Sequence, residues 1–338
     1  MALKRLRSKS GIMKIKIKDY IKIEKKPKKG LMALEWVMLG YLLITLLIVF
    51  FCYTKVQNPQ AMIWLRVNVA VTTLLVWGVY RMVPCRLTFI LRPLIQLAML
   101  SYWYSDTYEI NRMLPNLDHV FAGFEQQVFG CQPALLFSKV CSSAVFSELM
   151  DMGYVAYFPM IVTVVLYYAV RHYQLFEYCS FTILTSFFLF YLIFISLPVT
   201  GPMFYYQAVG LDDIARGVFP NVHDYFYTHQ ECLPSPGYTD GFFYNLVVSA
   251  HEAGERPTAA FPSSHVGITT VLMWLMWQVK GRKLFWILTP FYILLFLSTV
   301  YIQAHYAIDA IAGLITGTIF FWGLYFLSGK MRRGGLNK

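Results

Sequence analysis

Residues 260–279 read AFPSSHVGITTVLMWLMWQV, and residues 305–327 read HYAIDAIAGLITGTIFFWGLYFL. Each stretch begins with a short histidine-containing segment and continues as an apolar run of about the length that crosses a bilayer as a helix. Ionisable side chains are costly at the edge of a membrane span, so they indicate a functional site by default. We therefore expect His265, His305 and Asp309 to form one site at a membrane surface.

The composition is that of a polytopic membrane protein. Of the 338 residues, 57% are hydrophobic and 14% are charged, whereas a soluble domain carries about 25% charged residues. Because backbone groups must be paired within lipid, we expect an all-α membrane bundle. Arg66 lies inside an apolar run, and we expect its side chain to extend outward to the interface. Eight runs predict about eight spans: residues 31–53, 61–82, 87–104, 153–170, 178–199, 264–279, 284–302 and 307–327.

The net charge of +11 is concentrated at the N-terminus, because residues 1–30 contain 12 basic and 2 acidic residues. This arm has no folded reader module, so a nucleic-acid partner is not expected. A cytoplasmic arm on anionic lipid, or a pure topology signal, explains the charge. With the N-terminus inside, the site faces the non-cytoplasmic side, which is periplasmic or luminal. The expected cytoplasmic connections carry Arg81, Arg86, Arg171, Lys280, Arg282, Lys283, Lys330, Arg332 and Arg333.

This orientation divides the chain into segments. We expect a basic cytoplasmic arm (1–30), N-terminal spans (31–104), an external amphipathic segment (105–152), a membrane core (153–328) with an external loop (200–263), and a cytoplasmic tail (329–338). A loop of this length indicates a function or a cap over the membrane. The six cysteines have no metal-ligand spacing, so neither a metal nor a cofactor is expected. A disulfide between two external cysteines and a fully reduced set are both open.

The spacing of the polar residues indicates phosphoryl chemistry. Residues four apart lie on one helix face, so Asp309 can accept a hydrogen bond from one nitrogen of His305 and leave the other free to attack. His265 would protonate a leaving oxygen as general acid. Ser263, Ser264 and the first backbone N–H groups of that helix would hold phosphate oxygens. Taken singly, His265 is also compatible with a helix cap and His305 with an interfacial histidine.

The two motifs together resemble the type 2 phosphatidic acid phosphatase superfamily, whose members carry Pro-Ser-Gly-His followed by Ser-Arg-x5-His-x3-Asp. Residues 298–309, STVYIQAHYAID, keep the spacing of the second motif. Thr299 stands where arginine is usual, and Ser264 stands where glycine is usual. Residues 196–206, SLPVTGPMFYY, lie where a Lys-x6-Arg-Pro motif is expected and contain neither basic residue. The resemblance covers residues 153–327 and implies a six-helix core.

These departures resemble the branch of inositol phosphorylceramide synthases and sphingomyelin synthases. The resemblance implies transfer through a phosphohistidine on His305 without a metal. Because the basic motif residues are absent, we expect Arg256 to offset the phosphate charge, with Lys139, Arg216 and His251 as weaker candidates. Tyr205 and Tyr206 are the candidates for substrate contacts.

The leading hypothesis is a membrane enzyme that moves a phospho-head group, such as phosphoinositol, from a phospholipid to a ceramide-like alcohol. One alternative is a lipid phosphate phosphatase that hydrolyses phosphatidate-like or isoprenoid phosphates. Another is a non-enzymatic transporter or scaffold, which intramembrane charged pairs would favour. Lipids are the expected partners, whereas the sequence does not define the oligomeric state.

Overall fold

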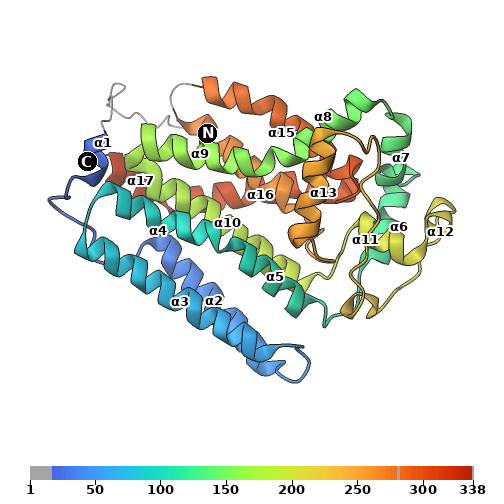
Figure 1. Ribbon diagram of the computed structural model, residues 1–338, viewed down its shortest axis with the longest axis horizontal. Coiled ribbons are helices and arrows are strands. Elements are labelled where there is room, and N and C mark those ends of the chain that lie inside the picture. Colours follow the sequence, from blue (N-terminus) through green and yellow to red (C-terminus); the bar gives the residue numbers. More distant parts are fainter. Residues whose placement is uncertain (1–16, 280–281, 337–338) are drawn as a thin grey trace.

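The computed structural model describes residues 17–279 and 282–336, which form an all-α bundle (Figure 1). Residues 1–16 of the expected basic arm, Lys280 of an expected cytoplasmic turn and the last two residues of the tail lie outside the described part. The prediction of a polytopic helical bundle is confirmed. The elements are α1 (Ile17–Ile21), α2 (Ala33–Phe51), α3 (Pro59–Met82), α4 (Arg86–Ala98), α5 (Leu100–Asn111), α6 (Asp118–Phe129), α7 (Pro133–Val140), α8 (Ala144–Val155), α9 (Tyr157–Arg171), η1 (Tyr173–Leu175), α10 (Phe176–Ser196), α11 (Pro202–Val209), α12 (Leu211–Ala215), η2 (Tyr225–Tyr227), α13 (Phe242–Gly254), α14 (Ser264–Gln278), α15 (Lys283–Tyr301), α16 (Ala307–Leu327) and α17 (Gly329–Leu336).

Five stretches of helix are long and apolar enough to cross a membrane: α2, α3, α10 with η1, α15 and α16. The pair α8–α9, bent by 44°, would be a sixth span. The other expected spans take different forms. Run 87–104 is divided between α4 and α5 by a break at Met99. Helix α14 has 15 residues, which is about 22 Å of helix. In the described part of the chain, full-length helices therefore account for five of the eight expected spans, and the bent pair α8–α9 would account for a sixth.

Helix α10 is the centre of the bundle. Its apolar window is 78% buried, whereas the windows of α2, α3, α15 and α16 are 22–33% buried. A helix that is apolar all round is expected in such a position, and Phe187, Phe188, Phe190 and Phe194 are all buried. Helices α2, α5, α9, α14 and α16 pack around it (Figure 1). The helices that carry the two histidine motifs are therefore held against one common core.

Three glycines bring α14 and α16 into backbone contact. A Cβ on Gly317 would lie 2.3 Å from the carbonyl oxygen of Gly267, and a Cβ on Gly313 would lie 2.4 Å from that of Ser263. Small residues four apart on a helix permit this approach in a membrane bundle. Because Ser263 directly precedes α14 and Gly313 lies two turns into α16, the contact fixes the beginnings of both helices relative to each other.

Two buried ion pairs join the N-terminal helices. Arg66 on α3 binds both carboxylate oxygens of Asp106 on α5 at 2.8 and 2.7 Å, and both side chains are 1% exposed. Arg92 on α4 binds Glu35 on α2 at 2.8 and 2.5 Å. The expectation that Arg66 extends outward was wrong, because α5 offers it a carboxylate inside the bundle.

The described end of the N-terminal arm packs against the bundle. Glu24 accepts hydrogen bonds from the hydroxyls of Tyr80 and Tyr173 at 2.9 and 3.1 Å. Lys28 forms an ion pair with Glu177 at the start of α10. Helices α1 and α17 lie at this end, whereas α6, α11 and α12 lie at the other end (Figure 1). The two described ends of the chain are thus on the same side of the bundle.

Removing Asp106 tests the buried pair between α3 and α5. In Asp106→Ala the buried Arg66 guanidinium keeps its hydrogen bond to the carbonyl of Met62 but loses its carboxylate partner, so we expect a loss of about 3–5 kcal/mol in the free energy of unfolding. The measurement is the thermal unfolding midpoint in detergent. Asp213→Ala is the control, because its partner Arg216 is 70% exposed and exposed pairs contribute at most ~1 kcal/mol. Equal midpoint shifts in the two variants would contradict this assignment.

Candidate active site

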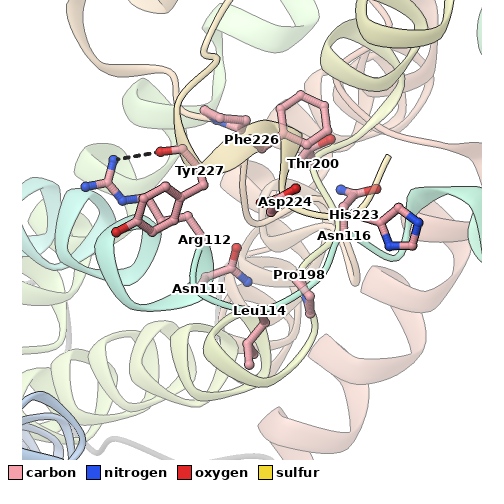
Figure 2. Close-up of a pocket in the computed structure, with 11 residues that line it drawn as sticks. Asn111, Arg112, Leu114, Asn116, Pro198, Thr200, His223, Asp224, Phe226 and Tyr227 are labelled. Carbon is pink, nitrogen blue, oxygen red and sulfur yellow. Dashed lines mark hydrogen bonds between the residues drawn. The ribbon is translucent and has the colours of Figure 1, made fainter. Parts of the chain in front are cut away.

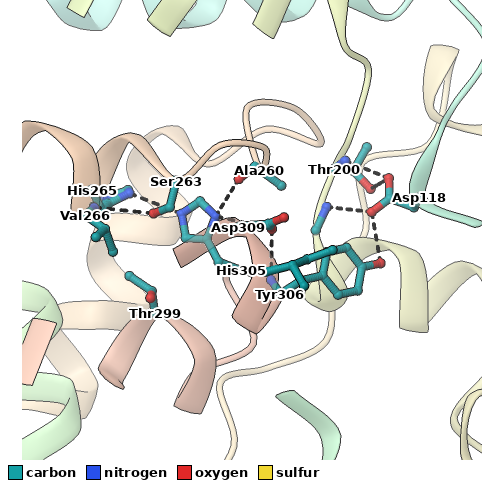
Figure 3. A network of polar contacts seen from close by, with 12 residues as sticks. Asp118, Thr200, Ala260, Ser263, His265, Val266, Thr299, His305, Tyr306 and Asp309 are labelled. Carbon is teal, nitrogen blue, oxygen red and sulfur yellow. Dashed lines mark hydrogen bonds and ion pairs between the residues drawn. The ribbon is translucent and has the colours of Figure 1, made fainter. Parts of the chain in front are cut away.

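The structure brings the two motif histidines together. His265 is the second residue of α14, and His305 lies in the loop between α15 and α16. Nε2 of His305 lies 3.5 Å from Nδ1 of His265, and the ring centroids are 5.6 Å apart (Figure 3). Two segments forty residues apart thus contribute one pair of imidazoles, as a shared site requires.

Asp309 does not make the hydrogen bond expected from its spacing. Its Oδ2 lies 3.7 Å from Nδ1 of His305 and instead accepts a hydrogen bond from the backbone N–H of Tyr306 at 2.9 Å. The reason is local: His305 precedes the first turn of α16, so the helical four-residue spacing does not apply to this pair. Asp309 therefore caps α16 and lies beside His305 without a direct hydrogen bond.

The carbonyl of Ala260 orients His305 in place of Asp309. Its oxygen lies 2.8 Å from Nδ1 of His305 (Figure 3). A carbonyl only accepts, so Nδ1 carries the proton, and in the neutral ring Nε2 holds a lone pair that faces His265. Burial lowers the pKa of His305 to about 4, against smaller opposing effects of the Ala260 hydrogen bond and the Glu255 charge. At neutral pH the His305 ring is therefore uncharged, and its Nε2 lone pair faces Nδ1 of His265.

Aromatic rings hold His265 in place. The ring of Tyr154, near the end of α8, stacks on it with centroids 4.9 Å apart. Tyr157, at the start of α9, packs on it at 4.4 Å. The bend between α8 and α9 at Ala156 turns both tyrosines toward the same imidazole. His265 is thus fixed in orientation by packing.

The two motif serines differ in their surroundings. Ser263 is fully buried; its Oγ accepts from the backbone N–H of Val266 at 3.4 Å, and its own N–H donates to the carbonyl of Asp309 at 3.0 Å. Ser263 therefore caps α14 and ties it to α16. Ser264 is partly exposed beside His265.

Thr299, which stands at the position where relatives carry arginine, supports the loop instead of supplying charge. Its hydroxyl donates to the carbonyl of Phe296 at 2.9 Å, and its carbonyl accepts from the backbone N–H of His305 at 2.9 Å. Its side chain is fully buried.

The other expected site residues have partners elsewhere. In the described part of the chain, the guanidinium of Arg256 donates to the carbonyl of Glu255 at 3.1 Å rather than to a motif histidine. Tyr205 and Tyr206 are fully buried. The Tyr205 hydroxyl donates to the carbonyl of Pro220 at 2.8 Å, and the Tyr206 hydroxyl donates to Gln132 at 2.9 Å. Both hydroxyls are thus engaged by the fold.

A buried carboxylate that sequence reasoning missed organises the surrounding loops. Asp118 begins α6, and its Oδ2 accepts from the backbone N–H and hydroxyl of Thr200 at 2.7 and 2.9 Å and from Asn116 at 2.6 Å. Its Oδ1 accepts from the backbone N–H of Gly201 at 2.9 Å and from the Tyr306 hydroxyl at 3.0 Å (Figure 3). Asp118 therefore joins three segments next to His305.

Glu125, seven residues further along α6, is the second missed carboxyl. Its Oε2 accepts from the backbone N–H of Ile308 at 3.1 Å, at the start of α16. Burial raises the pKa of Glu125 to about 8, and the nearby Asp309 charge acts in the same direction, so the group is largely protonated at pH 7. The sequence signal that could have revealed both groups is that Asp118 and Glu125, seven residues apart, lie on one face of a helix.

A small cavity borders Asn116 and Thr200, two of the residues that donate hydrogen bonds to Asp118. Its volume of about 10 Å³ is lined by Asn111, Asn116, Thr200, Phe226 and Tyr227 among others (Figure 2), and such a volume is about one water molecule. It is too small for a lipid head group. Within the described residues, no group of three or more His, Cys, Asp or Glu is arranged to hold a metal ion.

Two α6 variants test the positioning network. Asp118→Asn places an amide donor among the five donors that now face the carboxylate, so we expect a loss of about 1–3 kcal/mol in stability and lower activity. Glu125→Gln is the matched control, because it replaces a carboxyl that is already protonated at pH 7 by a group of the same shape. Thermal unfolding in detergent at pH 7 compares them, and indistinguishable midpoints would contradict the assigned role of Asp118.

Comparison with known proteins supplies the family. A family model described as PAP2 superfamily matches residues 119–323, which is more than half of the chain. No curated protein and no solved structure matches the sequence. We expected the family resemblance to cover residues 153–327. The matched range begins earlier, at residue 119, so it also includes most of α6 and all of α7. Because this range holds both histidine motifs and every helix that carries them, the chain belongs to the PAP2 superfamily.

Proposed function

We propose that this protein is an integral-membrane lipid phosphotransferase, which moves a phospho-head group such as phosphoinositol from a phospholipid to a ceramide-like alcohol. Membership of the PAP2 superfamily implies phosphatase-type or phosphotransferase-type chemistry. The observation that carries the proposal is the neutral Nε2 of His305 facing His265 at 3.5 Å. This geometry supports a nucleophile beside a proton donor, and the motifs resemble those of the inositol phosphorylceramide and sphingomyelin synthases.

The proposed reaction has two halves that use the same pair of imidazoles. In the first, Nε2 of His305 forms a bond to phosphorus while the bond from phosphorus to the diacylglycerol oxygen breaks, and His265, protonated to the imidazolium beside the bound phosphodiester, gives one proton to that oxygen and becomes neutral. In the second, the acceptor hydroxyl gives its proton to His265 and attacks phosphorus, and the phosphorus–nitrogen bond breaks. Asp309 favours the positive charge that develops on the His305 ring from 3.7 Å.

The charges around the site favour a phosphodiester donor. A phosphate monoester carries about 1.5 to 2 negative charges at neutral pH, whereas the diester of a phospholipid carries one. The arginine position of the second motif is Thr299, and the charges of Asp309 and Glu255 act close to His305. Like charges raise the cost of binding a dianion in a buried site. We infer that the substrate reaches His305 as a diester.

Helix α14 supplies the proposed phosphate-binding end. Its free backbone N–H groups and the hydroxyl of Ser264 are placed to donate to phosphate oxygens, while Ser263 holds that end in shape. Arg256 stays our proposal for a cation at the rim of the site, and loss of its side chain is expected to lower turnover. Tyr205 and Tyr206 act in this proposal as buried supports of the site wall.

The proposed orientation puts the site on the non-cytoplasmic face. The described parts of the basic arm and of the basic tail lie at one end of the bundle, and α6, α11 and α13 lie toward the other end (Figure 1). Basic residues collect on the cytoplasmic side of membrane proteins, which supports a cytoplasmic position for both chain ends.

A phosphatase that uses water as acceptor is the main alternative, because the same histidine pair serves both reactions. One observation favours the transporter alternative: two buried ion pairs lie among the N-terminal helices, one between α3 and α5 and one between α2 and α4. Each pair is closed and nearly unexposed, so it supports a structural role better than a charge pathway.

Replacement of His305 tests the nucleophile. We expect His305→Ala to lower kcat by roughly 1,000-fold or more with the unfolding midpoint nearly unchanged. Because the pKa of His305 is lowered to about 4, the nucleophile stays neutral down to that pH. The acid limb that it sets in the pH profile of kcat/KM is therefore expected near pH 4 rather than near 6.5. Full turnover in His305→Ala would end the proposal.

A product assay separates the two enzymes. Purified protein in vesicles receives head-group-labelled phosphatidylinositol with ceramide, or labelled phosphatidate. We expect label to move to ceramide together with release of diacylglycerol, because the site favours a diester. Release of inorganic phosphate from phosphatidate as the dominant reaction would instead establish the phosphatase. The His305→Ala protein is the blank in both assays.

A further inference from the structure

A third histidine lies against the same aromatic wall as the motif pair. His251 is on α13, which packs along α8, and it follows the buried Val247 by one helical turn. Its ring meets the ring of Tyr154 edge-on, with centroids 5.9 Å apart and an interplanar angle of 79°. From the sequence alone His251 is only a weak candidate for offsetting the phosphate charge, because nothing in the sequence pairs α13 with α8.

Tyr154 connects His251 to the candidate active site. One tyrosine ring contacts His251 at 5.9 Å and stacks on His265 at 4.9 Å. The two imidazoles also interact electrostatically. Three histidines, from α13, α14 and the loop before α16, are therefore linked by a continuous series of ring contacts through Tyr154.

The Nε2 atom of His251 is buried and has no hydrogen-bond partner among the described residues. Buried ring nitrogens are normally satisfied by protein or ligand groups. A donor without a partner, one aromatic ring away from the proposed acid, is what a site for an anionic oxygen would contain.

The described residues around His305 do not supply the positive charge that the motif arginine would bring to a bound phosphate. The arginine position of the family motif is Thr299, and Glu255 acts on His305 from the same segment as His251. Glu255 lies one turn after His251 and accepts a hydrogen bond from the Tyr104 hydroxyl at 3.1 Å. The titratable groups that we place around His251 are Tyr154, His265 and Glu255.

We propose that His251 is a substrate-binding residue of the phosphoryl site, whose Nε2–H donates to a non-bridging oxygen of the lipid phosphodiester in place of the missing motif arginine. This inference rests on the proposed function and deepens it, because it assigns the phosphate-oxygen contact to α13. His251 takes no part in bond making or breaking. It lowers the free energy of the bound phosphate and leaves nucleophilic attack to His305.

Leucine and glutamine variants test this role in purified protein. We expect His251→Leu to raise the KM for phosphatidylinositol in ceramide-containing vesicles by roughly tenfold or more, as for loss of a hydrogen bond to a charged group, with kcat changed much less. The conservative variant His251→Gln keeps an N–H near the Nε2 position, so it is expected to recover much of the affinity. His229→Leu is the control, because His229 is exposed and stacks on Tyr225 in the same external segment.

Inorganic vanadate gives a readout that does not depend on turnover. Binding to the folded state raises the unfolding midpoint, and we expect His251→Leu to lose most of the vanadate-induced shift that wild type and His229→Leu retain. A wild-type KM and a wild-type vanadate shift in His251→Leu would overturn the proposal. If His305→Ala keeps full turnover, the proposed function fails, whereas the vanadate shift still decides whether His251 binds the anion.

Discussion

The backbone contact between α14 and α16 is the constraint on which the site depends. Gly267, Gly313 and Gly317 leave no room for a side chain there, since an added Cβ on Gly317 would lie 2.3 Å from a carbonyl oxygen. In lipid, close packing of small residues drives helix association. Any larger residue would separate the end that carries His265 from the end that carries Asp309, and the 3.5 Å contact between the imidazoles would be lost with it.

Carboxyl groups, rather than cations, hold the loops around the histidines. Asp309 caps its own helix, Asp118 gathers donors from three segments, and Glu125 reaches the start of α16 from α6. Each group satisfies backbone N–H groups that would otherwise be orphaned in a buried place. The consequence is a rigid setting, in which burial keeps the His305 ring neutral although the Glu255 charge opposes that effect.

The sequence predicted the helical bundle from its apolar runs and brought His265 and His305 together from motif spacing. It could not predict what depends on three-dimensional neighbours. The four-residue spacing predicted a hydrogen bond that His305 donates to Asp309. His305 precedes the helix, however, and its ring is oriented by the carbonyl of Ala260 instead. Arg66 forms its ion pair with Asp106, which lies forty residues further along the chain on α5. Asp118 carries no motif, and its five donors come from segments that only the fold assembles.

The N-terminal helices lie outside the family match, yet they reach the site through α5. The buried pair with α3 fixes α5, and two of the hydrogen bonds that α5 makes reach α10 and the end of α13. Asn111 donates to the carbonyl of Phe194 at 2.5 Å, and the Tyr104 hydroxyl donates to Glu255 at 3.1 Å. Because Glu255 acts on His305, a change in the packing of α3 against α5 would alter the electrostatic field at the His305 ring. The N-terminal helices are therefore coupled to the candidate site through the hydrogen bond from Tyr104 to Glu255.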